Sequence, residues 1–463
     1  MSTEVWPNPI RPEAFHGIAG EFVRLVEEHT EADPVGLLLT FLAAAGSAIG
    51  NGPSIDLSGT RHTARIWPVL VGSTASGRKG TSLPWVKAVI EKADPTWSAC
   101  HASNVGSGEA VIWHVRDPIT TTDKDGKESI IDTGAIDKRL FIVESEFASV
   151  LKVASRDGSV LSPILRTAWD SDRLVHTTKH NPATATGAHI VVVGHITPEE
   201  LARELRETDR SNGFGNRFMF VMVRRTRVLP RGGSLPEGVL DGLAARLADV
   251  LPVARATHRL AHTEAFWQEY EPRYRSLSEP PPTMAGAMQG RGAPYVHRLA
   301  MLFALLDGER AIDGQHARAA LAVWDYCRDS VYHLFANGSG DPLRDRLYGA
   351  ILDAGGAGLT RTNLRDRLSR HGQKGDVERA LDKLMTGGLV VIEKVATAGS
   401  PTTIYRATEA TKATEAPTGD PYVAYVAHVA PADDAASAPQ SKKVCNGCGD
   451  PWSGIGSICE GCL

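Results

Sequence analysis

A glycine-rich segment carries the residues best suited to phosphate chemistry, Gly72-Ser-Thr-Ala-Ser76-Gly77-Arg78-Lys79-Gly80-Thr81-Ser82. Glycines after a buried strand let backbone amides approach a phosphate closely, and a following helix offers its free N-terminal amides. A lysine in such a loop meets the β and γ phosphates of ATP, and a neighbouring hydroxyl holds Mg²⁺. The segment therefore predicts a nucleotide-binding loop. We expect its contacts from Gly72, Ser76, Gly77, Arg78, Lys79, Gly80, Thr81 and Ser82.

The spacing departs from the common phosphate-loop pattern, in which lysine directly follows the second glycine and Ser or Thr follows the lysine. Here Arg78 intervenes, and Gly80 separates Lys79 from Thr81. Either the loop is one residue longer, with Lys79 and Thr81 or Ser82 in these roles, or Arg78 supplies the cation. We favour Lys79. The alternative is a solvated glycine-serine turn with incidental basic residues.

Two carboxylates follow a second apolar run, Leu140–Val143, at Glu144 and Glu146. Catalytic groups gather at the carboxyl ends of the strands in open α/β sheets. An ATPase needs one carboxylate near Mg²⁺ and one that orients or deprotonates the attacking water. If the chain stays extended, both side chains lie on the same side. The alternative is a strand that ends in a solvated acidic turn.

A third apolar run ends in polar residues that could sense the γ-phosphate, His195 and Thr197. Thr197 is equally suited to cap a helix that starts at Pro198. Arg217 precedes a fourth apolar run, and an arginine at a subunit edge can complete a neighbour's site as an arginine finger, which would imply a ring or filament. A salt-bridged or solvated cationic loop is the alternative for Arg217.

These residues need a scaffold, and apolar runs that alternate with helical patterns predict a doubly wound parallel sheet of the α/β class. We expect strands at the run that begins at Ile66, at Leu140–Val143, Ile190–Gly194 and Phe218–Val223. The polar stretch Thr120–Lys127 predicts an exposed hairpin or loop.

Several motifs together resemble an uncharacterised family of helicase-like P-loop ATPases encoded by phages, plasmids and other mobile elements, notably in actinobacteria. They are VGSTASGRKGTS, GSGEAVIWHVRD, LFIVESEF, SPILRTAWDSDRLV, NPATATGAHIVVVGHITPEEL and NGFGNRFMFVMVRR. The resemblance covers roughly residues 15 to 335. It implies a RecA-like core and a role in replicating the element's DNA. It also implies nucleotide ligands at Lys79 and Thr81, an acidic site at Glu144 or Glu146 with Glu109 near it, sensors at His195 and Thr197, and a finger at Arg217.

Residues 341–406 have the order of a winged helix, with three helical patterns followed by two short strands. Eleven Lys and Arg face eight Asp and Glu there, a net of +3 in a chain whose net charge is −4. Such residues would neutralise DNA phosphates, although winged helices also dock proteins. Basic residues cluster at Arg361, Arg365, Arg367, Arg370, Lys374, Arg379 and Lys383.

Two CxxC pairs end the chain, Cys445 with Cys448 and Cys459 with Cys462. Four thiolates complete a tetrahedral Zn²⁺ site, and the metal would supply the folding energy of a segment too short for a core. A redox dithiol pair or an iron–sulfur site is the alternative. Cys100 and Cys327 stand alone and are expected as buried apolar groups.

With 463 residues, 42% hydrophobic and 22% charged, the chain suggests several domains and excludes a wholly basic nucleic-acid binder. We expect a helical segment at 1–60, a P-loop core at 61–235, a helical extension at 236–340, the winged helix at 341–406, a flexible linker at 407–441 and a zinc ribbon at 442–463. No apolar run spans a bilayer, no signal peptide is evident, and the few cysteines favour the cytoplasm.

These features predict an ATP-dependent DNA-handling motor that uses ATP, Mg²⁺ and Zn²⁺, binds DNA and assembles with its own copies, with replication proteins as possible partners. A non-catalytic winged-helix regulator with a degenerate nucleotide site is the rival hypothesis. A kinase-like transferase on a small substrate is a second rival, which the DNA-type appendages do not favour.

Overall fold

The computed structural model describes residues 6–73, 77–177, 183–205, 209, 212–280, 284–335, 344, 347–348, 350–351, 354–367, 374–386, 389–395, 402–408, 443–444 and 451–452. The chain divides into two compact units, Met1–Arg406 and Ala407–Leu463, and each is described by itself.

A parallel sheet of five strands forms the centre of the first unit, in the order β11-β3-β10-β7-β4. The expected α/β class is therefore confirmed, and the sheet is compatible with a Rossmann or RecA-like core. The four predicted strands are all present. The fifth, β4, was not predicted. The bounds are β3 (Pro68–Val71), β4 (His101–Ala102), β7 (Arg139–Glu144), β10 (His189–Ile196) and β11 (Met219–Met222).

The apolar runs form central strands because both of their faces are covered. Every residue of β3, β10 and β11 is buried. Strand β10 pairs with β3 on one side and with β7 on the other. The strand that carries His195 therefore lies between the glycine-rich loop and the acidic strand end, and all three carboxyl ends share one edge.

Helix α2 (Pro34–Ile49) covers one face of this sheet and packs on β3, β7 and β10. Asp33 caps its first turn, because its carboxylate accepts the amide of Val35. Helix α5 (Phe147–Ala154) contacts β10 from the other face. A Cβ at Gly194 of β10 would lie 2.6 Å from the ring of Phe147, so only glycine lets this helix approach so closely.

The remaining helices complete the layers around the sheet. In the described ranges, no helix is both long and apolar enough to cross a bilayer. The principal helices are α1 (Gly17–Val26), α3 (Ser82–Ala93), α4 (Gly108–His114), α6 (Leu161–Asp170), α7 (Pro198–Glu204), α9 (Asp241–Ala256), α10 (Glu264–Ser278), α11 (Met284–Met288), α12 (Gly292–Leu306) and α13 (Gly314–Phe335). Cys100 and Cys327 are buried, as expected.

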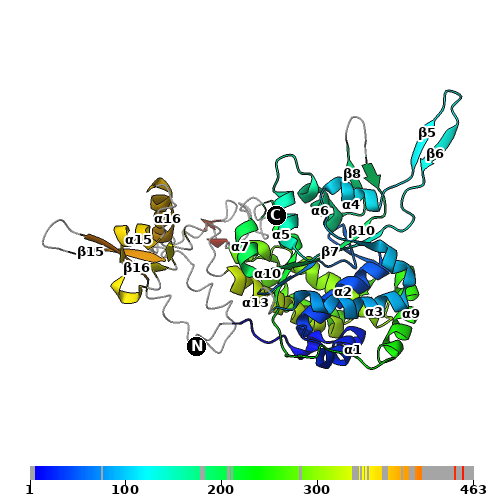
Figure 1. Ribbon diagram of the computed structural model, residues 1–463, viewed down its shortest axis with the longest axis horizontal. Coiled ribbons are helices and arrows are strands. Elements are labelled where there is room, and N and C mark those ends of the chain that lie inside the picture. Colours follow the sequence, from blue (N-terminus) through cyan, green and yellow to red (C-terminus); the bar gives the residue numbers. More distant parts are fainter. Residues whose placement is uncertain are drawn as a thin grey trace. The chain divides into compact units, whose positions relative to one another are not determined.

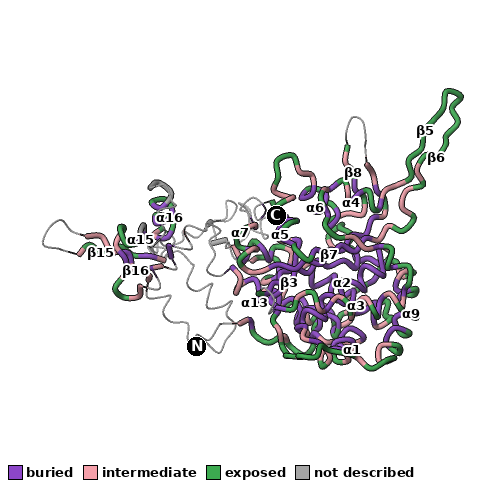
Figure 2. Tube along the Cα trace, viewed as in Figure 1, coloured by how far each residue is buried: buried purple, intermediate pink, exposed green. Residues whose placement is uncertain are grey.

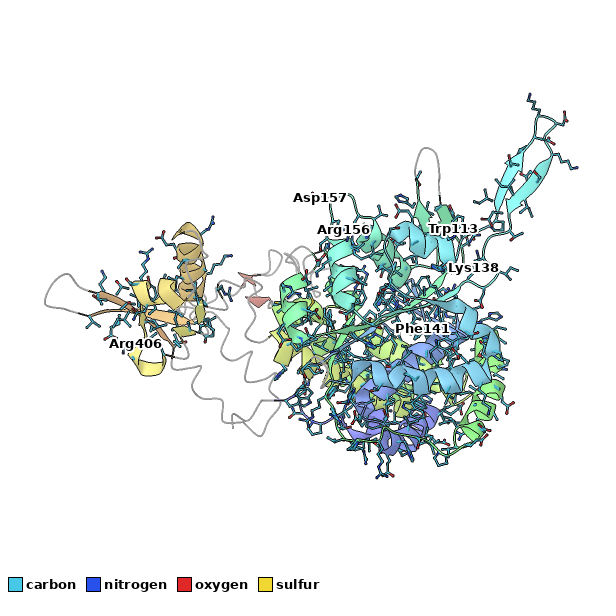
Figure 3. The ribbon with its side chains drawn as sticks, in the orientation of Figure 1. Trp113, Lys138, Phe141, Arg156, Asp157 and Arg406 are labelled. Atoms are coloured by element: carbon cyan, nitrogen blue, oxygen red, sulfur yellow. The ribbon has the colours of Figure 1, made fainter. Side chains whose placement is uncertain are left out.

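The stretch predicted as a hairpin or loop is an antiparallel hairpin, β5 (Ile119–Thr122) with β6 (Glu128–Asp132). Figure 1 shows it extending from the core, and Figure 2 shows it exposed along most of its length. Its base is fixed where Arg116 bonds Asp132 through two nitrogens and stacks on Trp113. Trp113 and Lys138 lie on the side of the core from which the hairpin extends (Figure 3).

Towards its end, the first unit contains α15 (Arg361–Arg367), α16 (Lys374–Thr386) and a three-stranded sheet of order β14-β16-β15. The strands are β14 (Leu359–Thr360), β15 (Val390–Val395) and β16 (Thr402–Ala407). The helix expected at Leu343–Leu352 is described only in part. In the second unit, β17 (Lys443–Val444) pairs with β18 (Pro451–Trp452), and the four predicted zinc ligands Cys445, Cys448, Cys459 and Cys462 lie outside the described residues.

Candidate functional site

The glycine-rich loop leaves β3 at Gly72, whose amide donates to the Ile196 carbonyl of β10 at 3.2 Å. A Cβ at Gly72 would lie 2.5 Å from the carbonyl oxygen of Val223, so the strand end has no room for a side chain there. The amide of Gly77 donates to the Ser73 carbonyl at 3.0 Å and so turns the chain back. The predicted ligand Ser76 lies outside the described residues.

The geometry separates the two candidate cations of the loop. Lys79 lies in a 3₁₀ turn (Lys79–Thr81), and its Nζ donates to the carbonyls of Gly72 at 2.5 Å and Ser73 at 3.3 Å. Arg78 has a left-handed φ of 43° and its Nε lies 2.6 Å from Oε2 of Glu31. A carboxylate already holds Arg78, whereas the hydrogen-bond partners of Lys79 in the described part of the chain are backbone oxygens of the loop. The arrangement thus favours Lys79 for phosphate contact.

An open cavity of about 320 Å³ lies at this edge of the sheet. It brings together the glycine-rich loop, the residue after β7 and the end of β10. Its lining residues are Ser73, Arg78, Lys79, Gly80, Thr81, Ser145 and His195.

The two candidate hydroxyls differ in where they point. Thr81 lines the cavity, and its Oγ1 donates to the Arg78 carbonyl at 2.5 Å. Ser82 is buried, and its Oγ lies 3.2 Å from Oγ1 of Thr40 on α2. Thr81 is therefore the hydroxyl that can reach a ligand without a change in the packing of α3.

His195 lines the cavity and carries a buried ring nitrogen without a partner in the described part of the chain. The residue is 4% exposed, and its Nε2 has no hydrogen-bond partner among the described residues. Burial lowers the pKa of His195 to about 4, and the positive charge of Lys79 acts in the same direction. The ring is therefore neutral at physiological pH, and the missing partner of Nε2 is a place that a ligand atom can fill.

The two carboxylates at the end of β7 lie in different surroundings, because the strand ends at Glu144 and the chain then turns into α5. Glu144 is buried, and its Oε1 accepts the Val105 amide at 2.8 Å. Burial raises the pKa of Glu144, while the amides of Val105 and Asn104 oppose the rise. Glu146 is exposed and precedes α5. The same-side arrangement expected for an extended chain does not form.

Three carboxylates act electrostatically on Lys79. Burial lowers the pKa of Lys79, and the negative charges of Glu200, Glu146 and Glu199 oppose that shift. Sequence reasoning missed Glu199, Glu200 and the wall residue Ser145. The position of Glu199 and Glu200 just after the end of β10 was a usable signal, since this edge gathers polar groups.

Thr197 and Glu109 have local partners. Thr197 caps α7, and its side chain and that of Glu200 form a reciprocal capping box. This confirms the capping role for Thr197, which does not appear among the residues that line the cavity. Glu109 is exposed in the first turn of α4, and its Oε1 lies 3.3 Å from Nε2 of His176.

Arg217 belongs to a group that we call the Trp169 cluster, in which an exposed carboxylate, Asp170, meets the buried residues Arg65, Trp169, Arg217 and Arg298. Arg217 is 7% exposed, and its Nη2 lies 2.5 Å from Oδ2 of Asp170. Arg298 stacks on Trp169 with its Cζ 3.7 Å from the ring centre and donates to the Trp169 carbonyl at 2.9 Å. Arg65 donates to the carbonyls of Ala168 and Ser171. These contacts match the salt-bridged alternative for Arg217 rather than a free finger.

A separate cluster has the composition of a metal site, with ligand atoms of His16, Asp307 and His316 within 4.8 Å of one another. Oδ2 of Asp307 lies 2.6 Å from Nε2 of His16 and 3.2 Å from Nε2 of His316. The Asp313 amide donates to Nδ1 of His316, so a neutral His316 carries its proton on Nε2 and donates it to Asp307. A metal would need that proton removed, and the cluster is better described as a hydrogen-bonded triad.

No known family profile matches this chain, and no curated protein matches it either.

Proposed function

We propose that this protein is an ATP-dependent DNA-handling motor, a helicase-like ATPase with a RecA-like core that acts in the replication of a phage, plasmid or mobile element. The observation that carries the proposal is the cavity at the carboxyl edge of the sheet. There a lysine held by loop carbonyls, a threonine hydroxyl and an unpartnered buried histidine nitrogen converge. This combination suits a polyphosphate, which offers negative charge and many oxygen atoms.

In this proposal Lys79 leaves the loop carbonyls and neutralises the β and γ phosphates. Neutral His195 places its ring nitrogen against the terminal phosphate, where it reports whether that group is present. Glu146 orients the attacking water, because it is exposed and its charge acts on Lys79, whereas Glu144 fixes the chain after β4 through backbone amides. Thr81 and Glu146 offer oxygen atoms of the kind that Mg²⁺ takes, and bound Mg²⁺ would supply charge neutralisation.

The DNA side of the proposal rests on the winged helix and the zinc ribbon, which remain predictions. Arg379 and Lys383 are exposed one turn apart on α16, while Val377 and Leu381 of the same helix are buried. This face can meet a phosphate backbone. Arg361 is partly neutralised, because it pairs with Glu378.

The proposal is tested by ATP turnover of the full-length protein with and without DNA. Replacing Lys79 with Ala should lower turnover at least about 100-fold, because the phosphate charge loses its main partner. Lys92→Ala is the matched control, since Lys92 lies on α3 and pairs with Asp241 at the surface. Turnover at the wild-type rate in Lys79→Ala protein would refute the assignment.

A second candidate is a non-catalytic DNA-binding regulator. The burial of Glu144 and the ion pair of Arg217 with Asp170 favour it, because both groups are already engaged. A regulator would bind DNA equally well with and without ATP and would show no DNA-stimulated turnover. ATP-stimulated strand separation would exclude it.

A further inference from the structure

An arginine-rich segment begins where β11 ends, next to the glycine-rich loop. Met222 of β11 is in register with Val71 of β3, and the Val223 carbonyl lies against Gly72. From residue 224 to residue 236 the chain has no acidic residue. It has four arginines, Arg224, Arg225, Arg227 and Arg231. We call residues 224–231 the arginine segment.

The loop at residues 29–33 holds this segment at several points. The Arg224 amide donates to Oδ2 of Asp33 at 3.0 Å, and Oγ1 of Thr226 donates to the Ala32 carbonyl at 3.3 Å. Just beyond the segment, a Cβ at Gly233 would lie 1.5 Å from the His29 carbonyl oxygen, so the two chains run in direct contact. The exposed arginines therefore project from a backbone that is already ordered.

Glu31 joins this segment to the glycine-rich loop. Its Oε2 lies 2.6 Å from Nε of Arg78, and its Oε1 accepts the Leu229 amide at 2.7 Å and pairs with Arg225. The Leu229 amide is the largest influence that lowers the pKa of Glu31, with help from Arg225 and Arg78, so the carboxylate stays charged. One carboxylate thus holds a cation of each segment.

We propose that the arginine segment binds the sugar-phosphate backbone of nucleic acid and that Glu31 couples this binding to the glycine-rich loop. Arg227 and Arg231 are exposed, and neither forms an ion pair with a carboxylate in the described part of the chain. Arg224 lies 4.8 Å from the ring centre of Trp6, which adds an aromatic surface of the kind that bases stack on. A backbone phosphate that draws Arg225 away from Glu31 changes how firmly that carboxylate holds Arg78. This inference rests on the proposed function, because the loop it regulates is the proposed ATP site.

Nucleic-acid binding by the arginine segment is tested with a labelled oligonucleotide, used as a single strand and as a duplex. Its affinity for the full-length protein is measured over a range of salt concentrations. The double variant Arg227→Gln and Arg231→Gln should bind at least about tenfold more weakly, and its plot of log affinity against log salt should be shallower by about 1.4 to 1.8, since two phosphate contacts are lost. The control is Arg246→Gln with Arg318→Gln, exposed arginines that pair with Glu21 and Glu269. An unchanged slope would overturn the proposal.

The coupling is tested by Glu31→Gln, which keeps the shape of the side chain and removes its charge. Oligonucleotide should change the ATP affinity and turnover of the wild type, and this response should disappear in Glu31→Gln protein, while its oligonucleotide affinity stays within about twofold. A response equal to that of the wild type would overturn the role of Glu31. If wild-type protein binds no ATP, the proposed function and the coupling both fail. The salt dependence of oligonucleotide affinity still tests whether the arginine segment binds nucleic acid.

Discussion

Two regions of the first unit bury cationic or histidine side chains, and they differ in what those side chains meet. At the cavity, and among the described residues, Lys79 donates to loop carbonyls and Nε2 of His195 has no partner. In the Trp169 cluster, the terminal nitrogens of Arg217 and Arg298 donate to Asp170 and to backbone carbonyls near the end of α6. Both regions pay a desolvation cost. In the second region the terminal nitrogens of the arginines recover part of it within the chain, while Nε of Arg217 and Nε of Arg298 have no hydrogen-bond partner among the described residues.

This difference distinguishes buried side chains that stabilise the fold from buried side chains that are available to bind a ligand. A buried cation that ties the end of a helix to a strand stabilises the fold, and its removal leaves carbonyls without donors. An unpartnered buried nitrogen on a residue that lines an open cavity contributes little to stability, and a ligand can supply its partner. The following predictions test this contrast.

The largest effect, a loss of folding stability, is expected in the Trp169 cluster. Replacing Arg298 with Met should lower the free energy of unfolding by about 4 kcal/mol, because the Trp169 carbonyl and the face of the indole ring lose their partner. Urea unfolding followed by tryptophan fluorescence measures this. Arg318→Met, at an exposed ion pair, should cost less than about 0.5 kcal/mol. A loss below about 1 kcal/mol for Arg298→Met would show that the cluster is not structural.

At the cavity we expect a smaller effect, which falls on ligand binding and not on the free energy of unfolding. Replacing His195 with Leu should weaken ATP binding about tenfold, because a hydrogen bond to a charged phosphate is lost. The free energy of unfolding should stay the same or rise by up to about 1 kcal/mol, since an unpaired buried polar atom is removed. Calorimetric titration and urea unfolding of the same protein measure both. Loss of stability with unchanged ATP affinity would reverse the interpretation.

A third effect concerns the pH dependence of stability. Burial lowers the pKa of His297 to about 3 and that of its neighbour His262 to about 4. Below pH 6.5 the unfolded chain takes up protons that these folded histidines do not, so the folded state is most stable above that pH and loses stability as the pH falls. In His297→Asn protein the loss between pH 6 and 4.5 should be shallower by up to about 1.4 kcal/mol per pH unit. An identical slope in both proteins would contradict the buried neutral state of His297.

The sequence allowed the main strands to be predicted, because continuous apolar runs bounded by glycine and polar residues leave few alternatives. Strand β4 was missed, since its two residues, His101 and Ala102, carry no periodic pattern. The ambiguity between Arg78 and Lys79 could not be resolved from spacing. It depends on Glu31, a residue far along the chain that is brought to Arg78 by the packing of the loop before α2.

The candidate carboxylates and hydroxyls also could not be distinguished from the sequence alone. The sequence placed Glu144 and Glu146 at a strand end, but the turn into α5 decides that one is buried and the other exposed. Thr81 and Ser82 are adjacent and chemically alike, and only the contact of Ser82 with Thr40 separates them. Arg217 was identified as a candidate finger because the sequence does not show that Asp170 lies beside it.

Helix α2 has a consequence for how the protein is made. Every residue from Val35 to Ile49 is buried, and the partners of α2 include α9 and α12. After α2 leaves the ribosome, roughly 250 further residues must be translated before α12 can cover it, which takes about 10 to 50 s at ordinary synthesis rates. During that time α1 and α3 can already pack on α2, but the apolar residues that contact α9 and α12 stay uncovered, and we expect a nascent-chain chaperone to bind them.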